Sequence, residues 1–220
     1  FASAALSRIL AGTMVITYHG GQCFKVSFGS TTLAFDPISK QSKLPTAKFG
    51  ADIALVSTWH PDCNGVDQVT HAGKQPFLVD GPGEYEIGEV TVRGFETPTE
   101  LGGAGARNTV YQVRLEDMNL LFLGALSAAE SLDQSILGDI AEVDILFLPI
   151  GGNTVMEVPE ASKLAVKLEA NLVIPMRFDE QSLAAFRKEE GAENAAPVEK
   201  LTVKKRDVAS MSGEVVVLAS

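Results

Sequence analysis

The order of the regular elements constrains the fold of this chain more than any other feature of its sequence. Short runs rich in β-branched and aromatic residues, separated by Gly and Ser turns, fill the first half from Met14 onward. The second half alternates amphipathic helical segments with apolar strands, and it ends in two or three further strands. A single domain over residues 14–220, with two sheets carrying helices on their outer faces, satisfies this order.

The pattern assigns individual elements within this order. The last predicted helix has Asp179 as a candidate N-cap and Gly191 as its stop. Other helices are predicted at residues 64–73, 131–140 and 158–170, and interior strands at Leu55–Ser57, Leu120–Leu123, Ile145–Pro149 and Val173–Met176.

Charge and hydropathy exclude two classes of partner. The chain of 220 residues has a net charge of −10, which argues against a nucleic-acid surface because phosphate binding needs clustered Lys and Arg. The one basic cluster, Lys204–Arg206, is interpreted as a solvated turn of a hairpin. No run of 18 apolar residues occurs, so no membrane-spanning helix and no membrane partner are expected.

The cysteines indicate the cellular compartment of the protein. Two cysteines, Cys23 and Cys63, do not make a disulfide framework, and free thiols indicate a reducing, cytoplasmic compartment.

Residues 1–13 precede Met14, and Arg8 interrupts their apolar run. We interpret residues 1–13 as a non-native, vector-derived leader; a short appended helix is the structural alternative.

A candidate metal-binding loop follows the apolar run that ends near residue 57. The stretch "LVSTWHPDCNGV" at residues 55–66 contains His60, Asp62 and Cys63. All three side chains are legitimate zinc ligands. A tight zinc site needs three or four ligands that converge, and no such converging set is evident in the sequence.

The chain resembles the metallo-β-lactamase superfamily, in particular its small branch of Zn-dependent hydrolase-like proteins. The resemblance runs from Met14 to the C-terminus and is carried by ordered segments at residues 18–26, 33–37, 55–66, 80–97, 105–111, 120–126, 144–161 and 173–178. It implies an α+β fold, a four-layer αβ/βα sandwich of two facing mixed sheets flanked by helices. It also implies an active site at the sheet edges, where the loops converge.

The resemblance further implies one or two metal ions, usually zinc, held by a His-x-His-x-Asp-His loop. Two zinc ions about 3.5–4 Å apart would activate a bridging water. His60 and Asp62 match this loop, whereas Thr58 and Cys63 stand where the family has histidines.

The remaining ligand positions depart from the family pattern as well. Ala125 stands where the family has the Asp that bridges the two metals, and Arg177 replaces a metal-ligand His. Gly21 replaces an active-site His, and no His follows His71. If a metal is present, the resemblance leaves His60, Asp62 and Cys63 to hold it.

Several residues of the expected vestigial pocket have two readings. Asp36 supports the metal loop in the family, but a purely structural role in an Asp-Pro turn explains this residue equally well. Trp59 either fills the room left by a ligand and water or has a plain packing role. Cys63 beside His60 could be a nucleophile, but neighbours in one loop rarely form such a pair. Glu84 and Tyr85 are interpreted as a strand start and His19 as a packing or turn residue.

The substitutions suggest a replacement for the metal. Arg177 puts a fixed cation where the family keeps a metal ligand, and it is predicted to pair with Asp62. The first hypothesis is therefore a non-metal pseudoenzyme or small-molecule-binding protein with no cofactor. The alternative is a zinc-dependent hydrolase of a phosphoester, lactone or similar ester, in which His60 and Asp62 are catalytic. A third hypothesis is a subunit of a homo-oligomeric assembly.

Overall fold

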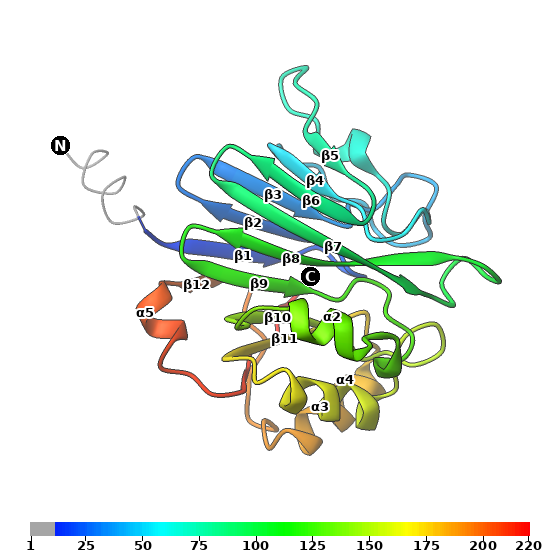
Figure 1. Cartoon of the computed structure of the whole chain (residues 1–220), viewed down its shortest axis with the longest axis vertical. Coiled ribbons are helices and arrows are strands. Elements are labelled where there is room, and N and C mark those ends of the chain that lie inside the picture. Colours follow the sequence, from blue (N-terminus) through cyan, green and yellow to red (C-terminus); the bar gives the residue numbers. More distant parts are fainter. Residues whose placement is uncertain (1–11) are drawn as a thin grey trace.

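A computed structural model describes residues 12–220, and these form two facing mixed sheets (Figure 1). The first sheet has the strand order β12-β1-β2-β3-β4-β5. Its strands are β1 (Met14–Tyr18), β2 (Phe24–Phe28), β3 (Thr31–Phe35), β4 (Ile53–Leu55), β5 (Phe77–Val79) and β12 (Leu201–Val203). Strands β3, β4 and β5 run parallel, and β12, β1, β2 and β3 are antiparallel neighbours.

The second sheet has the strand order β13-β11-β10-β9-β8-β7-β6. Its strands are β6 (Gly83–Ile87), β7 (Val90–Pro98), β8 (Arg107–Leu115), β9 (Met118–Phe122), β10 (Ile145–Pro149), β11 (Leu172–Met176) and β13 (Glu214–Val215). Strands β9, β10, β11 and β13 run parallel, and β6 to β9 form an antiparallel meander.

Aromatic side chains join the inner faces of the two sheets. The ring centroids of Phe35 on one sheet and Phe122 on the other lie 4.9 Å apart, and those of Phe24 and Phe147 lie 4.8 Å apart. All four rings are fully buried. Aromatic pairs at this spacing add to the stabilisation from burial alone, so the sheets are held face to face.

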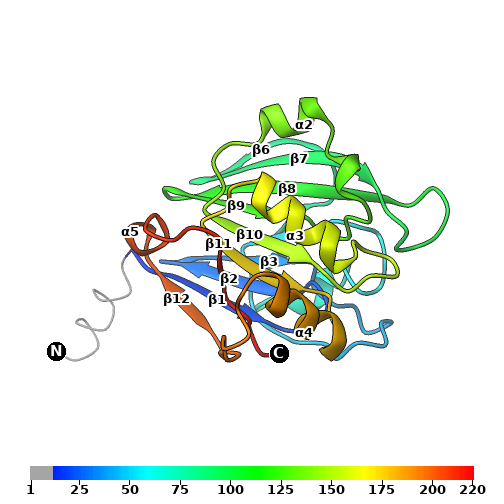
Figure 2. The same ribbon diagram turned by 90° about the horizontal axis from the view of Figure 1, so that it is seen from below.

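Helices cover the outer face of the second sheet (Figure 2). These are α2 (Gln134–Asp139), α3 (Val158–Lys167) and α4 (Glu180–Glu189), with η2 (Ala129–Ser131) before α2. Asp179 caps α4, since its side chain accepts a hydrogen bond from the Ser182 N–H at 2.8 Å. The outer face of the first sheet is covered by residues 37–52 and by the 3₁₀ turn η1 (Val66–Val69).

The sandwich expected from the resemblance is confirmed, with shifts in particular elements. Residues Leu55–Ser57 were predicted as a strand, but β4 ends at Leu55 and Ser57 belongs to the following loop. The helix predicted at 64–73 is only the 3₁₀ turn η1. The cluster Lys204–Arg206 does not form a hairpin turn, because α5 (Lys205–Val208) begins there.

Two further predictions concern the first residues and the membrane. The interpretation of residues 1–13 as a leader falls largely on residues 1–11, outside the described part of the chain. Between residues 12 and 220, no helix is long and apolar enough to cross a membrane.

Helix α5 is tied to the second sheet by a buried charge. The carboxylate of Asp144, just before β10, has no solvent exposure, and Lys205 Nζ lies 2.7 Å from both of its oxygens. The Asn119 N–H also donates to Asp144, at 2.8 Å. A buried carboxylate needs such partners, because leaving it unpaired costs the desolvation energy of the charge.

We expect Lys205→Met to destabilise the protein by about 2 kcal/mol, because it leaves the buried Asp144 carboxylate without its cation. Arg206→Met is the matched control, since the Arg206 side chain is 80% exposed and its loss should change stability by less than about 0.5 kcal/mol. Urea unfolding measures both values. Equal effects of the two substitutions would contradict this role of Lys205.

Candidate functional site

The candidate site is built from loops at the carboxyl ends of the parallel strands. Asp36 follows β3, residues 56–65 follow β4, Ala125 follows β9 and Arg177 follows β11. Backbone bonds connect the two sheets here: the Thr109 N–H donates to the Ser57 carbonyl at 2.8 Å. The sequence-predicted residues of both halves of the chain therefore meet at one edge of the sandwich.

Asp36 anchors the loop after β4 from beneath. Its carboxylate is fully buried and accepts from the backbone N–H of Ser57 at 2.7 Å and from the Ser57 hydroxyl at 2.6 Å. Burial raises the pKa of Asp36 to about 7, and the two bonds from Ser57 oppose that shift. Asp36 therefore supports the loop and is not only a turn residue.

Arg177 and Asp62 form an ion pair at the centre of the site. Arg177 Nη2 lies 3.3 Å and Nη1 lies 3.4 Å from Asp62 Oδ2, and Nη1 also donates to Gln22 Oε1 at 3.1 Å. The Ser42 hydroxyl donates to Asp62 Oδ1 at 2.5 Å. The side chains of Arg177 and Asp62 are 19% and 16% exposed, so the pair is largely shielded from water. The prediction that these two side chains lie within hydrogen-bonding reach is confirmed.

The backbone around Arg177 fixes where its guanidinium lies. Arg177 has a φ of +49°, a conformation that costs energy for a residue with a side chain. A side chain at Gly151 would put its Cβ 1.9 Å from the Arg177 carbonyl oxygen, so only glycine fits there. The Arg177 N–H donates to the Gly21 carbonyl at 2.8 Å, which joins the end of β11 to the turn after β1.

Two of the positions that differ from the family pattern, Cys63 and Ala125, lie in an apolar and hydrogen-bonded interior. Cys63 and Ala125 are fully buried in one cluster with Leu101 and Val155. The Cys63 thiol lies 3.6 Å from Gln22 Oε1, and burial raises the pKa of that thiol well above its ordinary value. A buried thiol that stays protonated is a poor nucleophile.

Thr58 is held by a residue that sequence reasoning did not single out. Its hydroxyl lies 3.5 Å from the Asn108 side-chain oxygen, which also accepts from the Ala125 N–H at 2.8 Å. Asn108 lies within the segment 105–111 that carried the resemblance, but nothing in its sequence context indicated this contact. Gln22, which bonds Arg177, was likewise missed; its side-chain Nε2 is buried and has no partner among the described residues.

His60 and Trp59 lie at the mouth of the site. The Asp62 N–H donates to His60 Nδ1 at 3.2 Å. Trp59 is 65% exposed, so it neither fills the space of a lost ligand nor packs in the interior, contrary to both predicted roles. His19 stacks on Phe49 with centroids 5.0 Å apart, and Glu84 and Tyr85 lie on β6, as their structural interpretations predicted.

The residues present do not fit the metal site that the family implies. From Gly12 to the C-terminus, no three His, Cys, Asp or Glu side chains are placed to hold one ion. His60 and Asp62 lie side by side, but Cys63 turns into the apolar cluster and Arg177 pairs with Asp62. A guanidinium against the surviving carboxylate competes with any cation for the same ligand.

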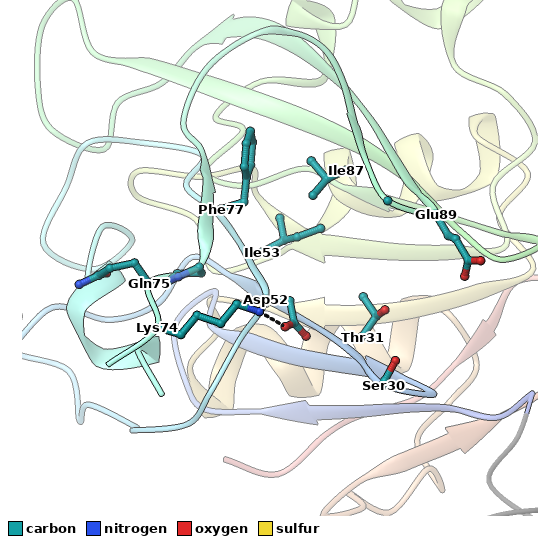
Figure 3. A pocket seen from close by; sticks show the side chains of 11 residues that line it. Ser30, Thr31, Asp52, Ile53, Lys74, Gln75, Phe77, Ile87 and Glu89 are labelled. Atoms are coloured by element: carbon teal, nitrogen blue, oxygen red, sulfur yellow. Dashed lines mark hydrogen bonds and ion pairs between the residues drawn. The ribbon is translucent and has the colours of Figure 1, made fainter. Parts of the chain in front are cut away.

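A cavity of about 360 Å³ opens beside the ion pair. Its lining includes Asp62 and Arg177, the loop Gly151–Thr154 and the start of α4 at Asp179. A second hollow, of about 750 Å³, lies at the opposite end of the sandwich, where β3, β4 and β5 begin (Figure 3). Two of its three charged residues, Asp52 and Lys74, pair with each other at 3.2 Å, and the third is Glu89. The hollow includes none of the predicted site residues.

Comparison with other proteins agrees with the fold of the chain. The chain is 25% identical over 201 residues to a metal-dependent hydrolase of Listeria welshimeri, covering 76% of this chain and 86% of the relative. It is 29% identical over 199 residues to a metal-dependent hydrolase of a Geobacillus species, with the same coverage. A solved structure from Thermotoga maritima, assigned to the metallo-β-lactamase superfamily, has a TM-score of 0.74, 25% identity and coverage of 93% and 98% of the two chains.

The sequence profile of one family matches most of the chain. It is described as the beta-lactamase superfamily domain, and the match spans residues 15–177, from β1 to the residue after β11. The two sheets, the converging loops and this match lead to one assignment. The protein belongs to the metallo-β-lactamase superfamily.

Proposed function

We propose that this protein is a metallo-β-lactamase-fold pseudoenzyme that binds a small molecule without a metal ion. The observation that carries the proposal is the ion pair between Arg177 and Asp62. In this arrangement, the guanidinium supplies the positive charge that a metal supplies in the family. The free, buried Cys23 and Cys63 suit a reducing, cytoplasmic compartment.

The charge balance of the site supports the proposal. Two or three negative groups would need a divalent cation, but here the bridging carboxylate is replaced by Ala125. The raised pKa of Asp36 leaves that carboxyl partly protonated at neutral pH. One guanidinium therefore suffices for the one remaining carboxylate, Asp62.

A metal-dependent hydrolase is the second candidate, because the curated relatives carry that description. This candidate would act on a phosphoester, lactone or similar ester. A zinc ion would need His60, Asp62 and Cys63 together. Cys63 would have to leave its apolar cluster and Arg177 would have to release Asp62.

Metal content separates the two candidates. We expect protein purified without a chelator to carry well under one zinc per chain by plasma mass spectrometry, because Arg177 competes for Asp62. The combined substitution Thr58→His, Cys63→His, Ala125→Asp and Arg177→His restores the ligand types of the family and should raise the zinc content. Stoichiometric metal that is lost in Asp62→Ala would refute the pseudoenzyme proposal.

A double-mutant cycle tests the ion pair. We expect Arg177→Ala and Asp62→Ala each to destabilise the protein by about 2–3 kcal/mol, between the values typical of exposed and buried pairs. The double variant should cost less than the sum of the two. Arg107 and Glu96, 3.7 Å apart and both more than half exposed, form the control pair, whose coupling should stay below about 0.5 kcal/mol. Additivity at Arg177 and Asp62 would show that no functional pair exists.

The pH dependence of stability tests the protonation state of the Asp36 carboxyl. The pKa of Asp36 is about 7 in the folded state, above the ordinary 3.8, so the folded state binds the proton of Asp36 more tightly than the unfolded state. The free energy of unfolding should therefore fall as the pH rises from about 4 to about 7. This contribution is at most about 1.4 kcal/mol per pH unit. Asp36→Asn should remove it, and Asn also tolerates the φ of +42° at this position.

The matched control for Asp36→Asn is Asp117→Asn, because the side chain of Asp117 is 83% exposed. Its pH profile, measured by urea unfolding across the same range, should follow that of the unchanged protein. If Asp36→Asn and Asp117→Asn give the same profile, Asp36 is charged throughout this range and the charge balance above is wrong.

A further inference from the structure

The charges around the cavity beside Arg177 specify a class of ligand. We infer that this cavity binds a small zwitterion, a molecule of α-amino-acid size with an ammonium group, a carboxylate and a short apolar body. The inference rests on the proposed function, because a metal-free site leaves Arg177 and Asp62 to contact the ligand. It goes further by naming what occupies the cavity.

Carboxylates outnumber cations in the cavity wall. Asp62 and Asp179 line it together with a single cation, Arg177. The hydrogen bonds from Ser182 lower the pKa of Asp179, so that carboxylate is charged at neutral pH. Because the chain also has a net charge of −10, a ligand with only negative charge is repelled, and an ammonium group is favoured.

Arg177 keeps capacity for a ligand carboxylate. Its contacts with Asp62 are 3.3 and 3.4 Å, longer than the 2.7–2.9 Å typical of a charge-assisted hydrogen bond. A guanidinium has five N–H donors, and Nε has no acceptor among residues 12–220. A ligand carboxylate can therefore bind Arg177 while the ligand ammonium binds the nearby carboxylates.

The shape of the cavity limits the size of the ligand. Its volume of about 360 Å³ lies at the lower end of the range for small-molecule sites. Leu44 and Phe178 give it an apolar wall, against which a short aliphatic body can pack. Gly21 preserves that wall, since a Cβ there would lie 2.8 Å from Leu44 Cδ1. The loop Gly151–Thr154 forms the other side.

Three probes with similar branched aliphatic bodies test the inference by isothermal titration calorimetry on the full chain at neutral pH. L-leucine carries both charges, 4-methylpentanoate carries only the carboxylate, and 3-methylbutylamine carries only the ammonium. We expect L-leucine to bind about tenfold more tightly than either singly charged probe, because it alone satisfies both signs of charge in the cavity.

A pair of matched substitutions assigns the ammonium contact. Asp179→Asn removes the charge but keeps the N-cap of α4, because Asn caps helices as well as Asp does. It should weaken L-leucine binding about tenfold. Asp133→Asn is the control, since Asp133 caps α2 in the same way, with bonds to Ser135 and Ile136, but lies outside the cavity. It should leave binding unchanged.

Any result other than those expected above overturns the inference. Equal binding of 4-methylpentanoate and L-leucine would identify a plain anion site, and no saturable binding of L-leucine would exclude the zwitterion. Equal losses in Asp179→Asn and Asp133→Asn would show an effect of capping alone. Zinc analysis of the same sample separates a failure of this inference from a failure of the proposed function. Metal-free protein that does not bind L-leucine refutes only the ligand class. Stoichiometric zinc refutes the proposed function as well.

Discussion

The negative charge of Asp62 is the constraint on which the candidate site depends. A carboxylate that is only 16% exposed must be balanced, because burial without a partner costs several kcal/mol. Arg177 balances it from the end of β11, and Ser42 and Gln22 complete the network around the pair. The glycines at positions 21 and 151 follow from this placement, since side chains there would collide with Leu44 and with the Arg177 backbone.

The rest of the candidate site is consistent with a single balancing cation. Asp36 is fully buried and bonded to Ser57, while Cys63 and Ala125 pack with Leu101 and Val155. The raised pKa of Asp36 and the alanine at position 125 both limit the negative charge of this interior. The fold of a metal-dependent family is thereby retained around a site with different electrostatics. Fold membership alone does not decide the chemistry of such a site.

Much of the fold could be predicted from the sequence, because hydrophobic periodicity and turn residues report on local structure. Strand β10 has the predicted bounds, and α4 has the predicted cap at Asp179. Errors occurred where the local signal was short. The segment at 64–73 makes only a 3₁₀ turn. Lys205 begins the short helix α5 and its ammonium pairs with the buried Asp144. That partner is 61 residues away in the chain and leaves no local pattern.

The sequence by itself determined the class of fold, the family and the residue types at positions 58, 63, 125 and 177, because each of these is a matter of residue type and order. Only the tertiary structure decided how the remaining groups meet. It set the geometry of the predicted pair of Arg177 and Asp62, turned Cys63 into an apolar cluster and left Trp59 exposed. It also brought Asn108 and Gln22 into the site. Contacts and burial between distant segments set these roles, and side-chain charge is balanced in space and not along the chain.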